Sequence, residues 1–480
     1  MDNAFALISF IFYNAVLVAV GVWAVRKAKS QEDFLLGGRS LGPWVAGLAY
    51  AASSSSAWVL LGFSGFVYAA GPSALWMVPG ILVGYGVIWL FSGDMLQRVS
   101  REKNHLTLTD FVVENAQGRL ARIIRILSAL IICFCYAYFI AAQFQGAGVA
   151  FADLFNMNLY TGVIFGAAII LIYTFLGGFF AVSITDTMQG ILMACVAIIL
   201  PTVAFFAAGG LEGISQGIAA APDGYTDAFG GRTGWIAIGF VLGLSATGFG
   251  ALGQPHLVSW IMATRDRTAR LYGAGVAIGW GAVVYTGMGV LGLSARAIYG
   301  AEAPAEGVFF QLASDYLPAL LGGLVAAATL SAIMSTVDSQ FLVVGAAVSH
   351  DVGIGKLMGG REVLVSRLSI LVLCVAAVGL TFFVPSTIFD RALFAWVAMG
   401  ATFGPIIVAR TLNFQFSAEI ALTAVLVGFG TSLGFEFFWE SGPGDVLGRV
   451  LPWIFGLIIL SIAHFAKLGP LRDAARAERN

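Results

Sequence analysis

The segment AASSSSAW, from Ala51 to Trp58, places four consecutive serines in the middle of a long apolar run. In a membrane helix, an isolated serine usually bonds back to a carbonyl one turn earlier or packs at a helix contact. Four adjacent serines cannot all face one neighbour, because successive residues turn by about 100° around a helix axis. The segment is therefore predicted to be a polar, unwound break. Such backbone is tolerated at membrane depth only where it is packed in protein or lines a wet cavity.

The whole chain has the composition of a large membrane protein. Apolar residues make up 59% of its 480 residues, whereas only 25 are Lys or Arg and 26 are Asp or Glu. An ordinary soluble domain of this length would carry roughly 120 charged residues. The 60 glycines follow no fixed period and 13% of the residues are aromatic, so a fibrous or low-complexity chain is excluded.

Apolar runs of about 20 residues are long enough to cross a bilayer as helices, and we predict thirteen of them in an all-α integral membrane fold. The first is too long for a signal-peptide core and precedes a basic cluster, so it is expected to be retained. The thirteen runs cover residues 4–25, 42–69, 72–93, 124–153, 158–180, 186–209, 234–258, 270–295, 317–345, 363–384, 388–410, 415–438 and 449–467.

The basic residues test this count. With an odd number of spans the two ends of the chain lie on opposite sides, and alternate loops should be rich in Lys and Arg. Of the 25 basic residues, 21 fall in one set of alternating segments. The other four are Arg232, Arg296, Arg391 and Arg449. We therefore expect a multi-pass protein of the cell inner (plasma) membrane, with its N-terminus outside and its C-terminus in the cytoplasm.

A second break is predicted in the seventh span. There TGFGALGQPH, from Thr247 to His256, contains three glycines followed by Gln254 and Pro255. Interrupted apolar segments at matching positions in two halves of a chain point to a midplane substrate site of the kind found in secondary transporters.

The spacing of the two breaks predicts how the single domain, residues 1–480, is organised. The broken spans lie five apart, so each can open a five-helix repeat, and because five is odd the second copy would be inverted. These repeats cover residues 40–209 and 234–411. Residues 1–39 then form an extra N-terminal helix and a cytoplasmic loop, and residues 412–480 form two extra helices and a short cytoplasmic tail.

Few ionisable side chains lie inside the apolar runs, where each costs roughly 2.5–3.5 kcal/mol on insertion and is a functional candidate. The clearest is Asp338, within LSAIMSTVDSQF from Leu330 to Phe341. Helical spacing places Ala332, Ser335, Thr336 and Ser339 on one face beside it. This set of oxygens suits a hard cation such as sodium, to which unwound carbonyls would add further ligands. A Ser/Thr packing face, with Asp338 bonded to a neighbouring helix, is the alternative.

Asp186 lies where the sixth span is predicted to begin. At that position it is either an N-terminal helix residue favoured by the helix dipole or a second functional acid.

Four segments carry a family resemblance. They are DFLLGGRSLGPWV (Asp33 to Val45), LIYTFLGGFFAVSITDTMQ (Leu171 to Gln189), GQPHLVSWIMA (Gly253 to Ala263) and SAIMSTVDSQFLV (Ser331 to Val343). Together they resemble the sodium/solute symporter family, most closely its sodium/proline symporter branch. The resemblance implies a LeuT-type core of two inverted five-helix repeats, with one extra helix before it and two after.

The resemblance also implies a sodium site between the broken second span and the ninth. Its ligands are carried over by matching position. They are the backbone carbonyls of Ala52, Ser55 and Ala332 and the hydroxyls of Ser335 and Thr336. Asp186 matches a family aspartate associated with ion coupling. In some relatives this aspartate and later hydroxyls form a second sodium site, and the matching positions here are Ser335, Asp338 and Ser339.

The chain departs from the sodium/proline branch at its substrate-side positions. Proline transporters of the family have an aspartate where this chain has Ser54, and a tryptophan and a tyrosine where it has Thr247 and Ala251. Loss of two large aromatic side chains predicts an enlarged or reshaped pocket, so proline specificity does not carry over on these residues. The predicted substrate contacts are Ser53, Ser54, Ser56, Trp58, Thr247, Ala251, Gln254 and Pro255.

These features predict a sodium-coupled secondary active symporter that imports a small polar organic solute, with proline or another amino acid as the best candidate. A proton-coupled symporter of the same fold, in which Asp338 or Asp186 titrates, is the nearest alternative. A solute-sensing membrane protein that acts through a separate partner is an alternative of another class. No His/Glu metal spacing and no nucleophile paired with a base is found, so no enzymatic activity is expected.

Sodium is the coupling ion expected, with no other metal and no organic cofactor. Gly248, Gly250 and Gly253 spell GxGxxG, but inside an apolar span this pattern does not indicate a dinucleotide site. The expected partners are the solute, the sodium ion and membrane lipid, with no nucleic acid and no obligatory protein partner.

Overall fold

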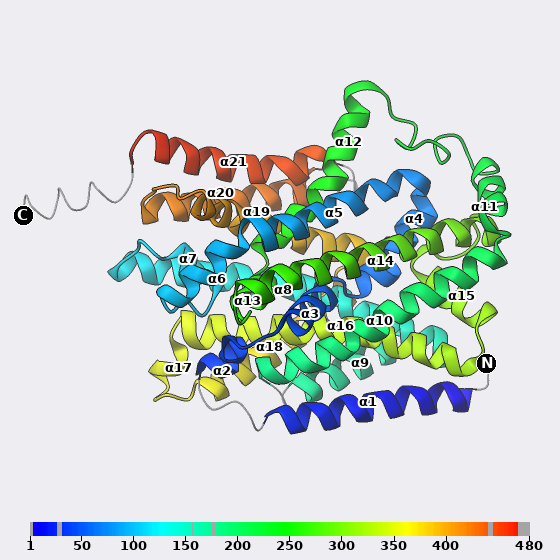
Figure 1. The fold of residues 1–480 in the computed structure, drawn as a ribbon, viewed down its shortest axis with the longest axis horizontal. Helices are drawn as coiled ribbons and strands as arrows, with labels where there is room; N and C mark the ends of the chain where they lie inside the picture. Colours follow the sequence, from blue (N-terminus) through cyan, green and yellow to red (C-terminus); the bar gives the residue numbers. More distant parts are fainter. Residues whose placement is uncertain (1–2, 26–30, 156, 175–177, 440–444, 469–480) are drawn as a thin grey trace, which may run out of the picture.

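The computed structural model describes residues 3–25, 31–155, 157–174, 178–439 and 445–468. These residues form helices and connecting segments, and their one isolated β-bridge pairs Leu41 with Thr264. Most of the long helices run along the longest axis of the molecule, as Figure 1 shows. The predicted all-α architecture is therefore what these residues adopt.

The second predicted span is broken within the serine run. Helix α3 (Pro43–Ser54) starts with a proline in its first turn. Ser55 caps its C-terminal end, and the N–H of Ser55 donates to the carbonyl of Ala52 at 3.2 Å. The chain becomes helical again through the π-helix η2 (Trp58–Phe63) and α4 (Ser64–Ala70). The non-helical stretch is shorter than predicted, because Ser53 and Ser54 still belong to the last turn of α3.

The seventh predicted span is also broken. Helix α12 (Gly234–Ala246) tightens into the 3-10 helix η5 (Thr247–Gly253), and Gln254 is extended, with φ −84° and ψ 110°. Helix α13 (Pro255–Met262) then begins with a proline, which can occupy the first helical position because its missing N–H is not needed there. Both predicted breaks are confirmed.

The other elements follow in chain order. Before the first break lie α1 (Asn3–Val25), α2 (Gln31–Leu36) and η1 (Gly37–Arg39). Between the breaks lie η3 (Gly71–Trp76), α5 (Met77–Gly86), η4 (Val87–Phe91), α6 (Gly93–Glu102), α7 (Leu108–Val112), α8 (Gly118–Phe155), α9 (Leu159–Thr174), α10 (Phe179–Ala207) and α11 (Gly210–Ala219). After α13 come α14 (Arg267–Tyr299), η6 (Ala305–Gly307), α15 (Val308–Tyr316), α16 (Ala319–Ala346), η7 (Ala347–Asp351), α17 (Ile354–Leu357), α18 (Glu362–Phe383), α19 (Ile388–Thr411), α20 (Ala418–Phe438) and α21 (Val446–Phe465).

Ten helical stretches among the described residues are long and apolar enough to cross a membrane. The first and fifth predicted spans contain shorter apolar stretches, Ile11–Val20 and Leu159–Ile172. Each of the thirteen predicted runs has a helical counterpart in the same order, but the count of thirteen itself stays a prediction.

One predicted boundary is wrong. The fifth span was expected to reach residue 180 and the sixth to begin at residue 186, whereas α9 ends at Thr174 and α10 begins at Phe179. The apolar sequence continues between the two helices, so hydropathy alone could not locate their ends. Residues 175–177 lie outside the described residues.

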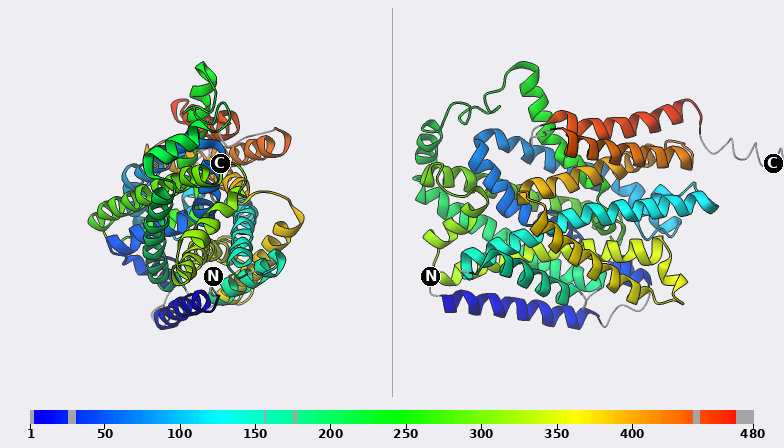
Figure 2. Two further views of the ribbon diagram at one scale, coloured as in Figure 1. Left: turned by 90° about the vertical axis from the view of Figure 1, so that its right-hand side faces the viewer. Right: turned by 180° about the vertical axis from the view of Figure 1, so that it is seen from behind.

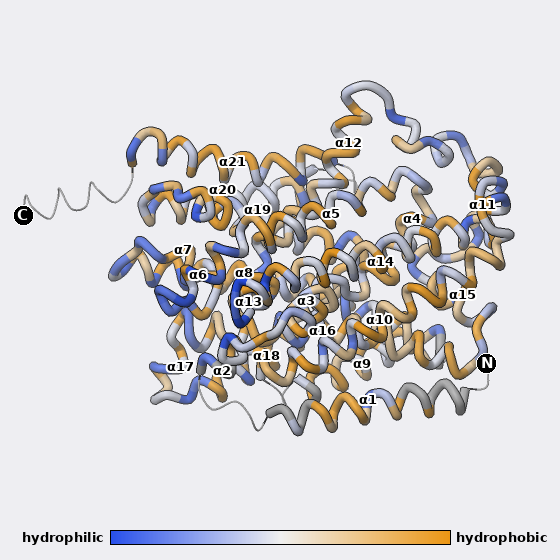
Figure 3. The backbone as a smooth tube through the Cα atoms, viewed as in Figure 1, coloured by the Kyte–Doolittle hydropathy of each residue, from blue (hydrophilic) through white to orange (hydrophobic). Residues whose placement is uncertain are grey.

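Polar residues gather at the two ends of the bundle. Figure 3 shows α6, α7 and α17 at one end and α11 at the other, with largely hydrophobic helices between them. Helix α1 starts at the end near α11 and runs along the outside of the bundle, whereas α21 finishes at the end near α7 (Figures 1 and 2). This arrangement agrees with an odd number of crossings.

Close helix packing explains part of the high glycine content. A Cβ added to Gly47 of α3 would lie 2.6 Å from the carbonyl oxygen of Gly273 in α14, and one on Gly84 of α5 would collide with Gly248 in η5. Small residues let membrane helices approach closely, and dispersion contacts then replace the hydrophobic driving force that lipid does not supply.

We expect Gly47→Ala to destabilise the bundle by about 1–3 kcal/mol, because the added methyl group has no space to occupy. Thermal melting of the purified protein in detergent measures the effect. Gly279→Ala in α14 is the matched control, since nothing lies within 4 Å of its added Cβ. Equal melting temperatures for the two variants would contradict the role given to Gly47.

Candidate functional site

A hydrogen bond joins the broken second span to the ninth. The hydroxyl of Thr336, on α16, donates to the carbonyl of Ser53 in the last turn of α3, with the two oxygens 2.9 Å apart. The same hydroxyl lies 3.2 Å from the carbonyl oxygen of Ala332 one turn earlier on α16. Both Thr336 and Ser53 are buried. The structure therefore brings together the two elements on which sequence analysis placed a sodium site.

The oxygens around this contact suit a hard cation. The five predicted sodium ligands are all buried, and none offers nitrogen or sulfur. Ser335 and Ser339 add hydroxyls on the same helix, and each bonds back to a carbonyl of the preceding turn. Because α3 ends here, its last carbonyls and the negative end of its dipole also lie at the site.

The hydroxyls of the serine run have different environments. Ser53 accepts a hydrogen bond of 2.8 Å from the indole of Trp260 on α13. Ser54 and Tyr85 of α5 share a short hydroxyl contact. The hydroxyl of Ser56 is buried and has no hydrogen-bond partner among the described residues. Of the predicted substrate contacts in this run, Ser56 is thus the one whose hydroxyl is not already used.

A side chain from another helix binds the backbone just before η2, where the chain becomes helical again after the serine run. The backbone N–H of Ala57 donates to the side-chain carbonyl of Gln143, on α8, at 3.1 Å. The indole of Trp58 lies among the rings of Tyr285, Phe389 and Trp396, with centroid separations of 5.9, 6.3 and 6.4 Å. Sequence analysis found Trp58 but missed Gln143, whose signal was a polar amide inside an apolar run.

Trp396 of α19 packs against the break in the seventh span. Its indole N–H donates to the carbonyl of Thr247 at 2.8 Å, and its own carbonyl accepts from the Gln254 amide at 3.0 Å. A Cβ on Gly250 would collide with the indole, so a glycine is required there. An aromatic wall is thus supplied from another helix, and the loss of large residues at Thr247 and Ala251 does not simply enlarge the space.

Two polar atoms of this break remain unpaired. Thr247 Oγ1 and Gln254 Oε1 are buried and have no hydrogen-bond partner in the part of the chain that the structure describes. Ala251 is fully buried beside them, and Pro255 lines a cavity of about 30 Å³. An unpaired buried polar group costs free energy, so these atoms are available to a bound polar molecule.

Asp338 and Asp186 are both fully buried. Asp338 Oδ1 accepts a hydrogen bond from Thr174 at the end of α9, whereas Asp338 Oδ2 and both oxygens of Asp186 have no partner among the described residues. No ion pair of the described residues includes either acid. A buried carboxylate without a partner is costly, so these groups need a cation or a proton.

The position of Asp186 in α10 shows whether this residue lies at the start of the helix, which the sequence left open. Helix α10 begins at Phe179 and has no acidic residue in its first turn. Asp186 lies about two turns inside the helix, beyond the reach of the favourable dipole at its N-terminus. The interpretation of Asp186 as a helix-start residue is therefore wrong. Thr174, the partner of Asp338, was missed because the sequence does not reveal which neighbouring helix faces α16.

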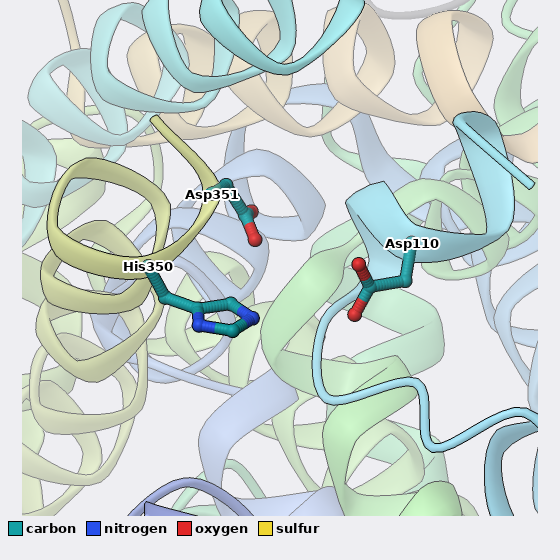
Figure 4. Close-up of side chains that lie close together, drawn as sticks. All are labelled: Asp110, His350 and Asp351. Carbon is teal, nitrogen blue, oxygen red and sulfur yellow. The ribbon is translucent and has the colours of Figure 1, made fainter. Parts of the chain in front are cut away.

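A charged cluster closes the end of the bundle near α7, and Figure 4 shows three of its side chains facing one another. Arg125 of α8 pairs with Asp110 of α7 at 2.9 Å and with Asp351 of η7 at 3.5 Å. Thr107 adds a hydroxyl hydrogen bond of 3.0 Å to Asp351. His350 lies in the same cluster, which has the residue types of a metal site. Because a guanidinium already pairs with both carboxylates, we interpret the cluster as an ionic latch.

This latch borders the small cavity that reaches the candidate site. Asp351 and Thr107 line the cavity at one end, and Ser339 and His256 also line it. Its volume, about 30 Å³, has room for about two water molecules. The cavity therefore lies between the latch and Ser339, a residue of the predicted second ion site.

The latch also fixes the ionisation of Asp110. Burial alone would raise the pKa of this carboxyl, but the backbone N–H of Leu106 and the guanidinium of Arg125 outweigh burial and lower the pKa below its ordinary value. The stabilisation from Asp110 is thus complete above the ordinary carboxyl pKa and is lost as the pH falls through the lowered value.

We expect the melting temperature of the protein to fall as the pH decreases below about 5, and to fall less steeply in Asp110→Asn, which has no carboxylate to protonate. Thermal melting in detergent across this pH range gives the two slopes. Asp315→Asn changes an exposed aspartate elsewhere and serves as the control. Parallel curves for the wild type and Asp110→Asn would refute the pH dependence assigned to the latch.

Two broken helices facing a polar, oxygen-lined centre inside a bundle of membrane-length helices define a secondary transporter. The model of the Sodium:solute symporter family matches residues 34–428. The chain belongs to this family. It is accordingly a multi-pass membrane transporter that couples solute transport to sodium.

Among known proteins, the chain is similar to the sodium/proline symporter of Escherichia coli (strain K12). The two are 30% identical over 487 residues, covering 98% of this chain and 95% of that protein. The "High-affinity proline transporter PutP" of Bacillus subtilis (strain 168) is 29% identical over 458 residues, covering 93% and 94%. Both similarities extend over nearly the whole chain, so they agree with the resemblance found in the sequence.

Two solved structures have a similar fold. A substrate-bound, outward-open Na⁺-coupled sialic acid symporter has a TM-score of 0.78 at 15% identity, with 96% of this chain and 97% of that chain covered. A nucleobase-cation-symport-1 family transporter in a closed conformation has a TM-score of 0.55 at 12% identity, with 92% and 97% covered. The predicted LeuT-type fold is confirmed.

Proposed function

We propose that this symporter imports a small amino acid, with proline as the best candidate, and that sodium binds where α3 ends against α16. The observation that carries the proposal is the Thr336 hydroxyl bonded to the carbonyl of Ser53, because it joins the broken helix to the helix that supplies the hydroxyl ligands. The sodium/proline symporters similar to this chain support the choice of solute.

In this proposal sodium is held by oxygens from both helices. The carbonyls of Ala52, Ser55 and Ala332 and the hydroxyls of Ser335 and Thr336 are its ligands. In the structure the Thr336 hydroxyl donates a hydrogen bond to the carbonyl of Ser53, whereas a sodium ion would contact the lone pairs of that hydroxyl. Exchange of a neutral hydrogen bond for an ion contact couples ion binding to the position of α3.

The solute would lie between the two breaks. Ser56, Thr247 and Gln254 supply buried polar atoms without partners, which can bind the charged ends of an amino acid. Trp58 supplies an aromatic surface for a compact apolar body such as the proline ring. The remaining proposed contacts, with Ser53, Ser54, Ala251 and Pro255, surround this space through the last turn of α3 and the break of the seventh span.

The proposed transport cycle follows from the helices that sodium and the solute each hold together. Sodium fixes the end of α3 to α16, the solute then contacts the seventh span, and opening of the latch releases both at the opposite end. One elementary charge gains about 2.3 kcal/mol per 100 mV of membrane potential. That energy corresponds to roughly fifty-fold accumulation of solute, because 1.4 kcal/mol is a factor of ten.

We assign the latch end of the bundle to the cytoplasm, since the loops there belong to the basic set of segments. This assignment places the start of α1 outside and the end of α21 inside. The repeats over residues 40–209 and 234–411 would then move relative to each other about the proposed site, flanked by the extra helices of residues 1–39 and 412–480.

At Asp338 and Asp186 the proton is a second candidate coupling ion beside sodium, and the unpaired oxygens of these two acids favour it. With sodium, these acids would form a second ion site together with Ser335 and Ser339. Without sodium, either acid could carry a proton instead. The two candidates differ in the gradient that drives uptake.

We expect Ser335→Ala and Thr336→Ala each to raise the sodium concentration for half-maximal uptake by about tenfold. Loss of one polar contact to a charged group costs about 1.5–3 kcal/mol of binding free energy. A change of about 1.4 kcal/mol alters affinity tenfold. Proline uptake by proteoliposomes over a range of sodium concentrations measures this value.

Thr329→Ala is the matched control for both variants, because Thr329 is a buried threonine of α16 whose hydroxyl bonds only its own helix at Val325. Normal protein amounts in the membrane would exclude a folding defect. Sodium activation curves like those of the wild type for both variants would show that the ion site lies elsewhere.

Asp338→Asn tests whether Asp338 takes part in coupling, and the gradient that drives uptake separates sodium from the proton. If Asp338 belongs to an ion site, the variant is expected to lose sodium-driven proline uptake at least tenfold, because an amide cannot replace the charge of a carboxylate ligand. Uptake is measured with an imposed sodium gradient and, separately, with an imposed pH gradient in sodium-free buffer. Wild-type uptake driven by the pH gradient alone would reject sodium coupling in favour of the proton.

A further inference from the structure

An apolar groove separate from the candidate site lies between α8, α18 and the end of α16. Its volume is about 550 Å³. Phe134 and Ala137 of α8 form one wall, Val348 of η7 forms the floor near Met358, and Val372 of α18 forms the other wall. No Asp, Glu, Lys, Arg or His lines the groove among the described residues.

The groove opens toward the side of the bundle that lipid covers. Leu368 and Val372 line it and are 49% and 69% exposed, and both lie on α18, a helix long and apolar enough to cross the membrane. An apolar hollow of this size at membrane depth takes up hydrocarbon more readily than water, because Cys133 and Ser369 are the only lining residues with a polar side-chain atom among the described residues.

Three basic residues lie close in sequence to residues that line the groove. Lys356 lies between the lining residues Ile354 and Met358, and Arg367 lies between the lining residues Val365 and Leu368. Arg361 directly precedes α18, and all three basic residues are exposed. Glu362 is the only acidic residue from 352 to 376, so this rim is positive overall.

From this combination we propose that the groove binds an anionic phospholipid, with one acyl chain between α8 and α18 and the phosphate at Lys356, Arg361 and Arg367. Basic pockets between membrane helices on the cytoplasmic side bind anionic headgroups, and each Lys or Arg near such a surface strengthens binding about fivefold. Long basic side chains can reach the headgroup while their stems cover apolar surface.

The bound chain would support the moving parts of the transporter. Val344 and Val348 line the groove, and they follow Thr336 and precede Asp351 along α16 and η7. An acyl chain in the groove therefore packs against the same helix that carries the hydroxyls of the proposed ion site and one carboxylate of the latch. The lipid site itself does not depend on which solute or ion the protein carries.

Native mass spectrometry of the full-length protein, titrated with phosphatidylglycerol or with phosphatidylcholine of the same acyl chains, tests the proposal. We expect phosphatidylglycerol to bind about tenfold more tightly or better. The triple variant Lys356→Gln, Arg361→Gln, Arg367→Gln should lose this preference. Arg267→Gln, a change at an exposed arginine of α14 that does not border the groove, should keep it.

A second pair of variants tests where the acyl chain lies. Val372→Trp fills the groove from an exposed position, whereas Val375→Trp changes a valine of the same helix that is 65% exposed and does not line it. We expect Val372→Trp to weaken phosphatidylglycerol binding about tenfold and Val375→Trp to leave it unchanged. Because both valines are exposed, neither substitution disturbs buried packing.

The proposal fails if the two lipids bind equally well, if the triple variant keeps the preference for phosphatidylglycerol, or if Val372→Trp and Val375→Trp behave alike. Any of these results would leave the proposed sodium-driven uptake untouched. Uptake lost in the ion-site variants with normal lipid binding would likewise leave the lipid site standing, so the two proposals can fail separately.

Discussion

The need to satisfy backbone hydrogen bonds where helices are broken inside a membrane governs this structure. Hydrocarbon offers no partner for a free N–H or C=O, so each break must be covered by neighbouring protein. At the first break, Gln143 receives the N–H of Ala57 and Thr336 donates to the carbonyl of Ser53. At the second, Trp396 donates to Thr247. The helices that cover the breaks thereby become the walls of the candidate site.

Hydrogen bonding at the two breaks is incomplete, and the unpaired atoms belong to side chains. The backbone contacts at the breaks are made, whereas several buried side-chain atoms of Ser56, Gln254, Asp186 and Asp338 have no partner among the described residues. In a protein that only had to fold, such atoms would be a liability of a few kcal/mol each. In the function we propose, these atoms bind the solute or the cation in place of water.

The sequence predicted the helical class, both breaks and the elements that carry the site, because apolar length, serine and glycine runs and intramembrane acids are local signals. Contacts between distant helices have no such signal. Trp396 against Gly250, Thr174 beside Asp338 and the latch through Arg125 each depend on which helices pack together. The start of α10 was also misplaced, since the sequence before it is as apolar as the predicted spans on either side.

The small cavity behind the latch bears on electrical insulation. A void of about 30 Å³, bordered by Asp351 and Ser339, cannot hold an ion with its hydration shell. Arg125, bridging Asp110 and Asp351, lies beside this cavity among the described residues. In the transport cycle we propose, the same guanidinium that holds this end of the bundle together would also limit the leak of hydrated ions through the cavity.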